Sequence, residues 1–200
     1  MSQPLTDINR RILIVDDTPS IHEDFRKILG GGSSAFDALG ETEYALFGAT
    51  PTAPAQPFVL DSAFQGEQAL AKVEAALDAQ APYAMAFIDM RMPPGWDGLQ
   101  TIARLWQVDP KLQVALCTAY SDYSWEDIAG QLDLGDRLLI LKKPFDAIEI
   151  RQMASTLTVK WQMTEQAELK TERLEQAVEA RTRELADANI IVQNLSLIHI

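Results

Sequence analysis

The sequence ILIVDD at residues 12–17 decides the fold, because four consecutive apolar residues end abruptly at two aspartates. The apolar run is continuous rather than alternating, and this pattern predicts a short strand buried on both faces, as in parallel sheets. Thr18 and Pro19 follow, and they suit the cap and the first position of a helix. A stripe of apolar residues at helical spacing then runs from Ile21 to Leu29.

The same alternation of strand and helix continues along the chain. Short apolar runs predict further strands at residues 58–60, 83–88, 114–117 and 138–141. Apolar residues at helical spacing predict helices between them at residues 66–77, 99–106 and 125–134. Such alternation is typical of right-handed βαβ units. We therefore expect an α/β fold in which a five-stranded parallel sheet is doubly wound, with helices on both faces.

The segment after Pro144 contains no further glycine or proline, and it predicts one long helix. Its first part should pack on the sheet. Further along, its residues fall at alternating spacings of three and four, which is the heptad pattern of a coiled coil. This seam consists of Thr171, Leu174, Val178, Arg181, Leu185, Ala188, Val192 and Leu195, and it is imperfect at the threonine and the arginine. Because no sheet covers the seam, we expect a parallel homodimer through this helix.

The composition excludes several classes of protein. The chain has 200 residues, and 47% of them are hydrophobic, which is enough for a packed core. The net charge of −12 argues against direct binding to nucleic acid. No apolar stretch is long enough to predict a membrane span, and no signal peptide is visible. Cys117 is the single cysteine and indicates a reducing compartment, so we expect a cytoplasmic chain.

Residues 30–57 differ from the rest in composition. Glycine and serine open this segment at residues 30–34, and three prolines close it at Pro51, Pro54 and Pro57. We interpret the segment as a surface insertion. The alternative is an element that docks a partner.

Polar side chains follow the predicted strands at the point where each strand ends. Asp16 and Asp17 follow the first strand, Asp89 the third, Thr118 the fourth and Lys143 the fifth. The carboxyl ends of parallel strands meet at one edge of the sheet. Three carboxylates there need a counter-charge, and Mg²⁺, which prefers oxygen ligands, supplies it. With a lysine and a threonine beside them, the set predicts phosphoryl transfer to one aspartate.

Five short motifs stand in order along the chain at these strand ends. They are IVDD at 14–17, FIDMRMP at 87–93, DGL at 97–99, TA at 118–119 and KPF at 143–145. Together they resemble the receiver domain of two-component response regulators. The resemblance implies a flavodoxin-like receiver fold over residues 10–158, interrupted by the insertion at 30–57. Residues 159–200 would then form the long helix, a coiled coil that leads to an output module the sequence does not contain.

The resemblance implies a phosphorylation switch rather than an enzyme. Asp89 would accept a phosphoryl group from a histidine kinase or a phosphotransfer protein. Thr118 and Lys143 would bind the phosphoryl oxygens and pull the loops that follow the fourth and fifth strands. The change would then switch a downstream output.

The resemblance also implies a set of Mg²⁺ ligands. Asp17 and Asp89 would bind the ion directly, together with the backbone carbonyl of Arg91. Asp16 would act mostly through a metal-bound water.

The sequence departs from the family pattern in three places. The loop that follows the phosphoacceptor, residues 93–97, is one residue longer than usual. Ile140 stands where the family usually has a switch aromatic, so an aromatic rotamer flip at this position is impossible. The insertion lengthens the first crossover. Arg91 and Tyr120 stand where the family tunes its rate of dephosphorylation.

Three other functions differ from the switch in what they require of the sequence. A Mg²⁺-dependent aspartyl-phosphate phosphatase usually needs a second acid two residues after the nucleophile, where Arg91 stands. A nucleotide-binding fold needs a glycine-rich turn after the first strand, where two aspartates stand instead. An unphosphorylated receiver that acts as a dimerising scaffold stays open, and acetyl phosphate with Mg²⁺ would leave its mass unchanged. We expect the chain to be a fragment of a longer protein.

Some residues have plainer interpretations. His22 is expected to be a solvated residue of the first helix, with a phosphorylated histidine as the alternative. Cys117 is expected in the core, and Lys142 is expected to be a solvated neighbour of Lys143. The aromatic residues near the acidic edge are expected to pack within loops or to face a partner; they are Trp96, Tyr120, Tyr123 and Trp125.

Overall fold

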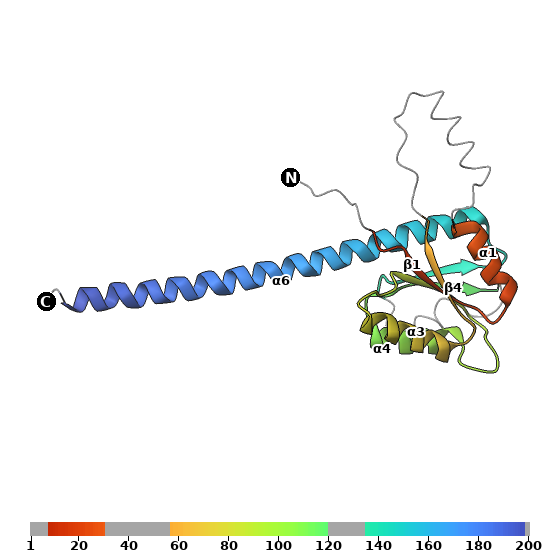
Figure 1. Cartoon of the computed structure of the whole chain (residues 1–200), viewed down its shortest axis with the longest axis horizontal. Coiled ribbons are helices and arrows are strands. Elements are labelled where there is room, and N and C mark those ends of the chain that lie inside the picture. The colour runs from red at the N-terminus through yellow and green to blue at the C-terminus, as the bar shows by residue number, and fades with distance from the viewer. Residues whose placement is uncertain (1–7, 31–56, 120–134, 199–200) are drawn as a thin grey trace, which may run out of the picture. The chain divides into compact units, whose positions relative to one another are not determined.

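The computed structural model describes residues 8–30, 57–119 and 135–198 of the chain, and Figure 1 shows their course. Within these residues five parallel strands form one sheet in the order β2-β1-β3-β4-β5. The strands are β1 Arg11–Val15, β2 Val59–Ala63, β3 Met85–Asp89, β4 Gln113–Thr118 and β5 Leu138–Lys142. The described helices are α1 Pro19–Leu29, α3 Gly66–Asp78, α4 Gly98–Val108 and α6 Ala147–Ile198.

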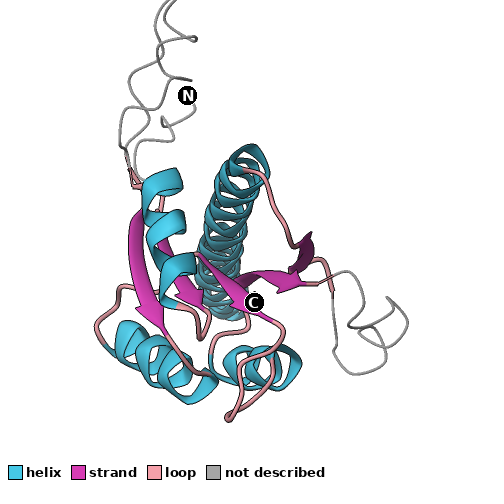
Figure 2. Cartoon of the chain, turned by 90° about the vertical axis from the view of Figure 1, so that its right-hand side faces the viewer, coloured by secondary structure: helices cyan, strands magenta, loops and turns pink. Residues whose placement is uncertain are grey.

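The sheet lies between two layers of helices. In Figure 2, α3 and α4 cover one face, and α1 and the first part of α6 cover the other. Strand β1 shows why both faces are apolar: Leu13 and Val15 join the core on the side of α3 and α4, whereas Ile12 and Ile14 join the core on the side of α1. Successive side chains of a strand point to opposite faces, so a continuous apolar run is what a doubly covered strand needs.

These observations confirm the predicted fold. The five strands, their parallel pairing and the long C-terminal helix are all present, and the fold is the flavodoxin-like receiver fold. The predicted stripe of α4 is buried throughout, at Leu99, Ile102, Leu105 and Trp106. The helix predicted at residues 125–134 lies outside the described residues, as does most of the insertion.

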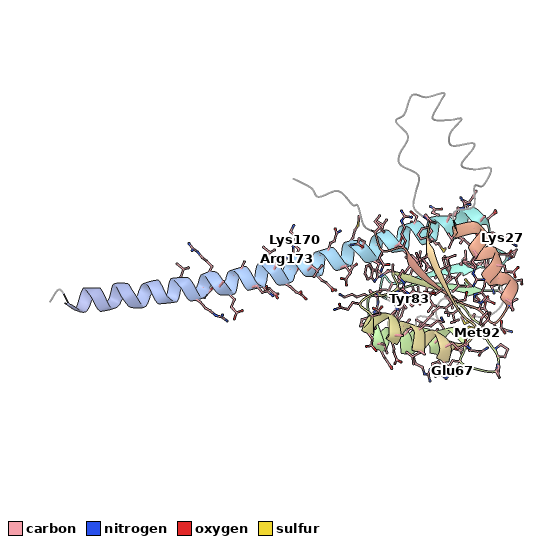
Figure 3. The ribbon with its side chains drawn as sticks, viewed as in Figure 1. Lys27, Glu67, Tyr83, Met92, Lys170 and Arg173 are labelled. Atoms are coloured by element: carbon pink, nitrogen blue, oxygen red, sulfur yellow. The ribbon has the colours of Figure 1, made fainter. Side chains whose placement is uncertain are left out.

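Strand β2 lies further along the chain than its apolar residues indicate. It includes Asp61 and Ser62, which the apolar run at residues 58–60 does not predict. Asp61 is held by Arg11, whose guanidinium lies 3.0 Å away, and by the hydroxyl of Tyr83, which donates to it at 2.8 Å. Burial, together with the bond to Asp61, raises the pKa of Tyr83 to about 12. Tyr83 is labelled in Figure 3. A polar residue is therefore tolerated in this edge strand.

The prediction that His22 is a solvated residue is wrong. Its side chain is 1% exposed and lies on the buried face of α1 with Phe25 and Leu29. Residues 22, 25 and 29 are spaced by three and four, so they share one side of the helix. This burial also contradicts the alternative of a phosphorylated histidine, because a kinase could not reach the ring.

The chain divides into two compact units, Met1–Gln162 and Met163–Ile200. In the second unit α6 continues to Ile198. Lys170 and Arg173 are labelled on it in Figure 3. Large apolar side chains on this stretch are exposed in the single chain, among them Leu174, Val178 and Leu185. Among the helices the structure describes, none combines the length and apolar character required to cross a membrane.

Candidate functional site

Three charged side chains meet at the carboxyl ends of β1, β3 and β5. The ammonium nitrogen of Lys143 lies 2.7 Å from Asp89 Oδ1 and 3.0 Å from Asp16 Oδ2. The side chain of Asp16 is 4% exposed and that of Asp89 is 11% exposed, so both carboxylates are largely removed from water. The lysine side chain, at 28%, is the part of the cluster that solvent still reaches. The cluster therefore places a buried aspartate beside a second aspartate and a partly exposed cation.

The cluster changes the proton affinity of its members. Burial raises the pKa of Asp89 above the ordinary aspartate value, and the negative charge of Asp16 adds to this, while Lys143 opposes it. Burial alone would lower the pKa of Lys143, but the two carboxylates outweigh burial and hold that pKa above its ordinary value. Lys143 therefore stays a cation at neutral pH.

In both carboxylates, the oxygen that does not contact Lys143 accepts a hydrogen bond from a backbone N–H group. Asp16 Oδ1 accepts a hydrogen bond from the backbone N–H of Thr18 at 2.9 Å. Asp89 Oδ2 accepts one from the backbone N–H of Arg91 at 3.1 Å. In each case an aspartate binds the chain two residues further on, which is a local turn typical of this residue. Each carboxylate thus has one oxygen on the backbone and one on Lys143.

Thr118 is joined to the cluster through the main chain. It is the last residue of β4, with 8% of its surface exposed. Its carbonyl oxygen accepts a hydrogen bond from the backbone N–H of Lys143 at 2.8 Å, and its hydroxyl donates to the carbonyl of Ala119 at 3.1 Å. The threonine that ends β4 and the lysine that follows β5 therefore stand side by side.

Asp17 lies next to Asp16 but is not part of the charged cluster in the contacts the structure describes. It is half-buried, and its carboxylate accepts a hydrogen bond from the Thr18 hydroxyl at 3.2 Å. Of the residues predicted from the sequence, the structure brings Asp16, Asp89 and Lys143 into direct contact. Asp17 and Thr118 lie at the same edge. Asp17 follows Asp16 in the chain, and Thr118 is bonded to Lys143 through the main chain.

The donor atoms at this edge are of a kind that can bind a metal ion. In the described part of the chain, no three or more His, Cys, Asp or Glu side chains are grouped closely enough to hold one. Lys143, rather than a divalent cation, supplies the counter-charge to Asp16 and Asp89 here. The donors are nevertheless carboxylate oxygens, which are of the kind that Mg²⁺ prefers. The chemistry of the residues therefore fits Mg²⁺.

The longer loop after Asp89 is held by Gln65, a residue for which the sequence predicted no role. The side chain of Gln65 accepts a hydrogen bond from the backbone N–H of Gly95 at 3.2 Å, and it donates one to the carbonyl of Pro93 at 3.4 Å. Gln65 precedes α3, so the bonds link two loops at the carboxyl edge. In the sequence only the position of Gln65 between a strand and a helix could have indicated this role.

The Asp-Gly-Leu motif at 97–99 has a structural explanation. Asp97 caps α4, because its side chain accepts a hydrogen bond from the backbone N–H of Gln100 at 2.7 Å. Gly98 lies so close to the end of β3 that a Cβ atom on it would stand 2.6 Å from the carbonyl oxygen of Asp89. A glycine is therefore needed where α4 meets the strand that ends at Asp89.

The remaining predicted residues have ordinary positions. Trp96 is half-buried, with the guanidinium of Arg104 over its ring at 4.1 Å. Ile140 is partly buried against the core beneath α3 and α4, and Cys117 is buried in the core on the other face. Lys142 is exposed. The other aromatic residues predicted near this edge, Tyr120, Tyr123 and Trp125, lie outside the described residues.

The family of the chain follows from this fold and a direct comparison. The family model of the response regulator receiver domain matches residues 52–155. The chain belongs to this family, which is in general a signalling family rather than an enzymatic one. The match begins after β1, so Asp16 and Asp17 lie outside the matched residues.

Solved structures of low sequence identity share the fold. The structure of an adenylate cyclase from Rhodopirellula baltica has a TM-score of 0.58 at 20% identity, and the alignment covers 82% of this chain and 98% of that one. The signal receiver domain of an HD domain-containing protein from Pseudomonas fluorescens Pf-5 has a TM-score of 0.57 at 19% identity, covering 83% and 98%. A CheY-like receiver domain protein from Methanospirillum hungatei JF-1 has a TM-score of 0.54 at 19% identity, covering 78% and 98%. No curated protein matches the sequence.

Proposed function

We propose that this chain is the phosphoacceptor part of a response regulator, in which Asp89 is phosphorylated by a histidine kinase or a phosphotransfer protein with the help of Mg²⁺. The observation that carries the proposal is the ammonium of Lys143 between the carboxylates of Asp89 and Asp16. A cation held beside a buried aspartate at the carboxyl edge suits a site where phosphoryl charge develops.

The transfer exchanges one bond for another. An oxygen of the Asp89 carboxylate attacks the phosphorus of a phosphohistidine, and the new O–P bond forms as the N–P bond breaks. The electron pair of the broken bond stays with the imidazole of the donor. Lys143 then neutralises a phosphoryl oxygen, and the hydroxyl of Thr118 turns from Ala119 to donate to another.

Mg²⁺ would be held by the acidic residues of the same edge. Asp17 and Asp89 would bind it directly with the backbone carbonyl of Arg91, and Asp16 would act through a water molecule. When bound, the ion offsets the charge of the incoming phosphoryl group. Lys143 must then exchange its present contacts with the two carboxylates for contacts with the phosphoryl oxygens.

The proposed output runs through the C-terminal helix. Lys143 is close in the chain to the start of α6 at Ala147, so movement of the lysine would reach the helix directly. We assign residues 10–158 to the receiver and residues 159–200 to a coiled coil. The exposed side chains of Leu174, Val178 and Leu185 support a homodimer, because pairing two helices would bury them. The buried Cys117 accords with the cytoplasm as the proposed compartment.

The test is phosphorylation by a small donor. Incubation with acetyl phosphate and Mg²⁺ should add the mass of one phosphoryl group, as measured by intact-protein mass spectrometry. Asp89→Asn should abolish the gain, and Asp24→Asn, a matched change on the exposed face of α1, should not. Equal labelling of the Asp89→Asn variant would refute the assignment of the phosphoacceptor. An unaltered chain that gains no mass would instead favour a scaffold that works unphosphorylated.

A further inference from the structure

His22 is a buried side chain whose presence packing does not explain. Its ring lies against Phe64, with the ring centroids 4.6 Å apart. Among the described residues, its Nδ1 atom has no hydrogen-bond partner. Burying an unpaired polar nitrogen costs free energy that a leucine or a phenylalanine at this position would avoid. A histidine at this position therefore indicates that its other ring nitrogen, Nε2, has a role.

That nitrogen binds the backbone at the end of β1. Nε2 of His22 lies 2.7 Å from the carbonyl oxygen of Asp16. Since a carbonyl oxygen only accepts hydrogen bonds, Nε2 carries the proton and donates it. The bond fastens the inner face of α1 to the turn that carries the acidic residues.

The carbonyl group that His22 holds belongs to the peptide that links Asp16 to Asp17. A peptide group is planar, so its oxygen and the Cα atom of the next residue turn together. Fixing the Asp16 oxygen therefore fixes the direction in which Asp17 leaves the strand. The Asp16 carboxylate accepts hydrogen bonds from the backbone N–H of Thr18 and from Lys143, whereas the described bond of the Asp17 carboxylate comes from the hydroxyl of Thr18.

We propose that His22 is a positioning residue for Asp17, acting through the peptide between Asp16 and Asp17. The inference rests on the proposed function, in which Asp17 binds Mg²⁺ directly. His22 touches no reacting atom; it sets the place of a ligand. Hydrogen bonds that orient metal ligands in this way typically change metal affinity by about 10–100-fold when they are lost.

The test compares two substitutions at this position. His22→Gln keeps an N–H donor at the same number of bonds from Cα, and His22→Leu removes the donor while filling the space with carbon. Mg²⁺ affinity, measured by calorimetry, should fall about tenfold in His22→Leu and recover most of that loss in His22→Gln. Thermal unfolding without Mg²⁺ should rank the two variants in the opposite order. His22→Leu should be the more stable of the two, because leucine avoids the unpaired nitrogen. Equal affinity in His22→Leu and the unaltered chain would overturn the proposal, and so would equal weakening in both variants.

A second readout separates this proposal from the proposed function. If the unaltered chain binds no Mg²⁺, the proposed function fails, and nuclear magnetic resonance without the ion decides the role of His22. The carbonyl carbon of Asp16 and the amide of Asp17 should shift in His22→Leu and return toward their original positions in His22→Gln. Unmoved signals in His22→Leu, or equal movement in both variants, would overturn the positioning role.

Discussion

Replacing Lys143 with methionine should destabilise the receiver, because it leaves two buried carboxylates without their cation. Methionine has a similar length and keeps the apolar part of the side chain in place. The ammonium, however, is the group within 3.0 Å of both Asp16 and Asp89. Its removal turns two carboxylates that share one cation into an uncompensated pair of like charges at the carboxyl edge.

The expected loss can be estimated from the burial of the three side chains. Removing one partner of a buried ion pair costs about 3–5 kcal/mol. Lys143 is 28% exposed, and water screens part of its charge, so the lower end of this range, about 3 kcal/mol, applies. For a domain of this size each kcal/mol lowers the melting temperature by roughly 2–4 °C, which gives a loss of about 9 °C.

The loss should depend on pH in a defined direction. The pKa of Asp89 is already raised by burial, and removal of the lysine charge raises it further. An acid whose folded-state pKa is raised destabilises the fold as pH rises through its unfolded and then its folded pKa. The difference between Lys143→Met and the unaltered chain should therefore be large at pH 7 and shrink as the pH falls toward 4.

The assay is thermal and urea unfolding followed by circular dichroism at pH 7 and at pH 5, without Mg²⁺. Lys142→Met is the matched control, because it removes the same charge from an exposed neighbour, and it should change the free energy of unfolding by no more than about 0.5 kcal/mol. A loss below about 1 kcal/mol in Lys143→Met, or a loss that is the same at both pH values, would refute the reasoning.

Two further predictions concern the metal and the helix. Asp17→Asn should weaken Mg²⁺ binding by more than the roughly tenfold loss that is typical when a residue that only orients a ligand is removed. Asp16→Asn should weaken it less, as measured by calorimetry. Unchanged affinity in Asp17→Asn would contradict the ligand assignment. Leu185→Asp should shift the mass in solution, measured by light scattering, toward the monomer, because it would bury a charge in the seam. An unaltered chain that is already monomeric at tens of micromolar would disprove the coiled coil.

Much of the fold was predictable because it depends on local patterns. Runs such as residues 12–15 are apolar on both sides, and a strand covered on both faces requires this. Strand β2 was predicted too early in the chain, because its later residues are polar. The partners of Asp61 in the strand are Arg11 and Tyr83, which come from distant parts of the sequence and which no local window contains.

The meeting of three charged residues at one edge was predictable, but their individual contacts were not. The strand ends indicated that Asp16, Asp89 and Lys143 would meet, since parallel strands share one edge. The sequence did not indicate which atoms contact each other, because this depends on where a long lysine side chain lies. His22 was misjudged for a similar reason: its partner is a backbone oxygen at the end of β1, and sequence patterns carry no information about such an atom.

The connection between α1 and β2 has a consequence for how such a chain can acquire new sequence. It runs from the end of α1 at Leu29 to the start of β2 at Val59, where a crossover often needs only a few residues. The entropy of closing a loop grows only with the logarithm of its length, by about 0.6 kcal/mol per doubling. For a flexible connection in general, three doublings of length cost roughly 2 kcal/mol, which is no more than the truncation of one buried leucine to alanine. Because β2 is an edge strand, the approach to it is a position where a receiver can gain residues without rebuilding its sheet.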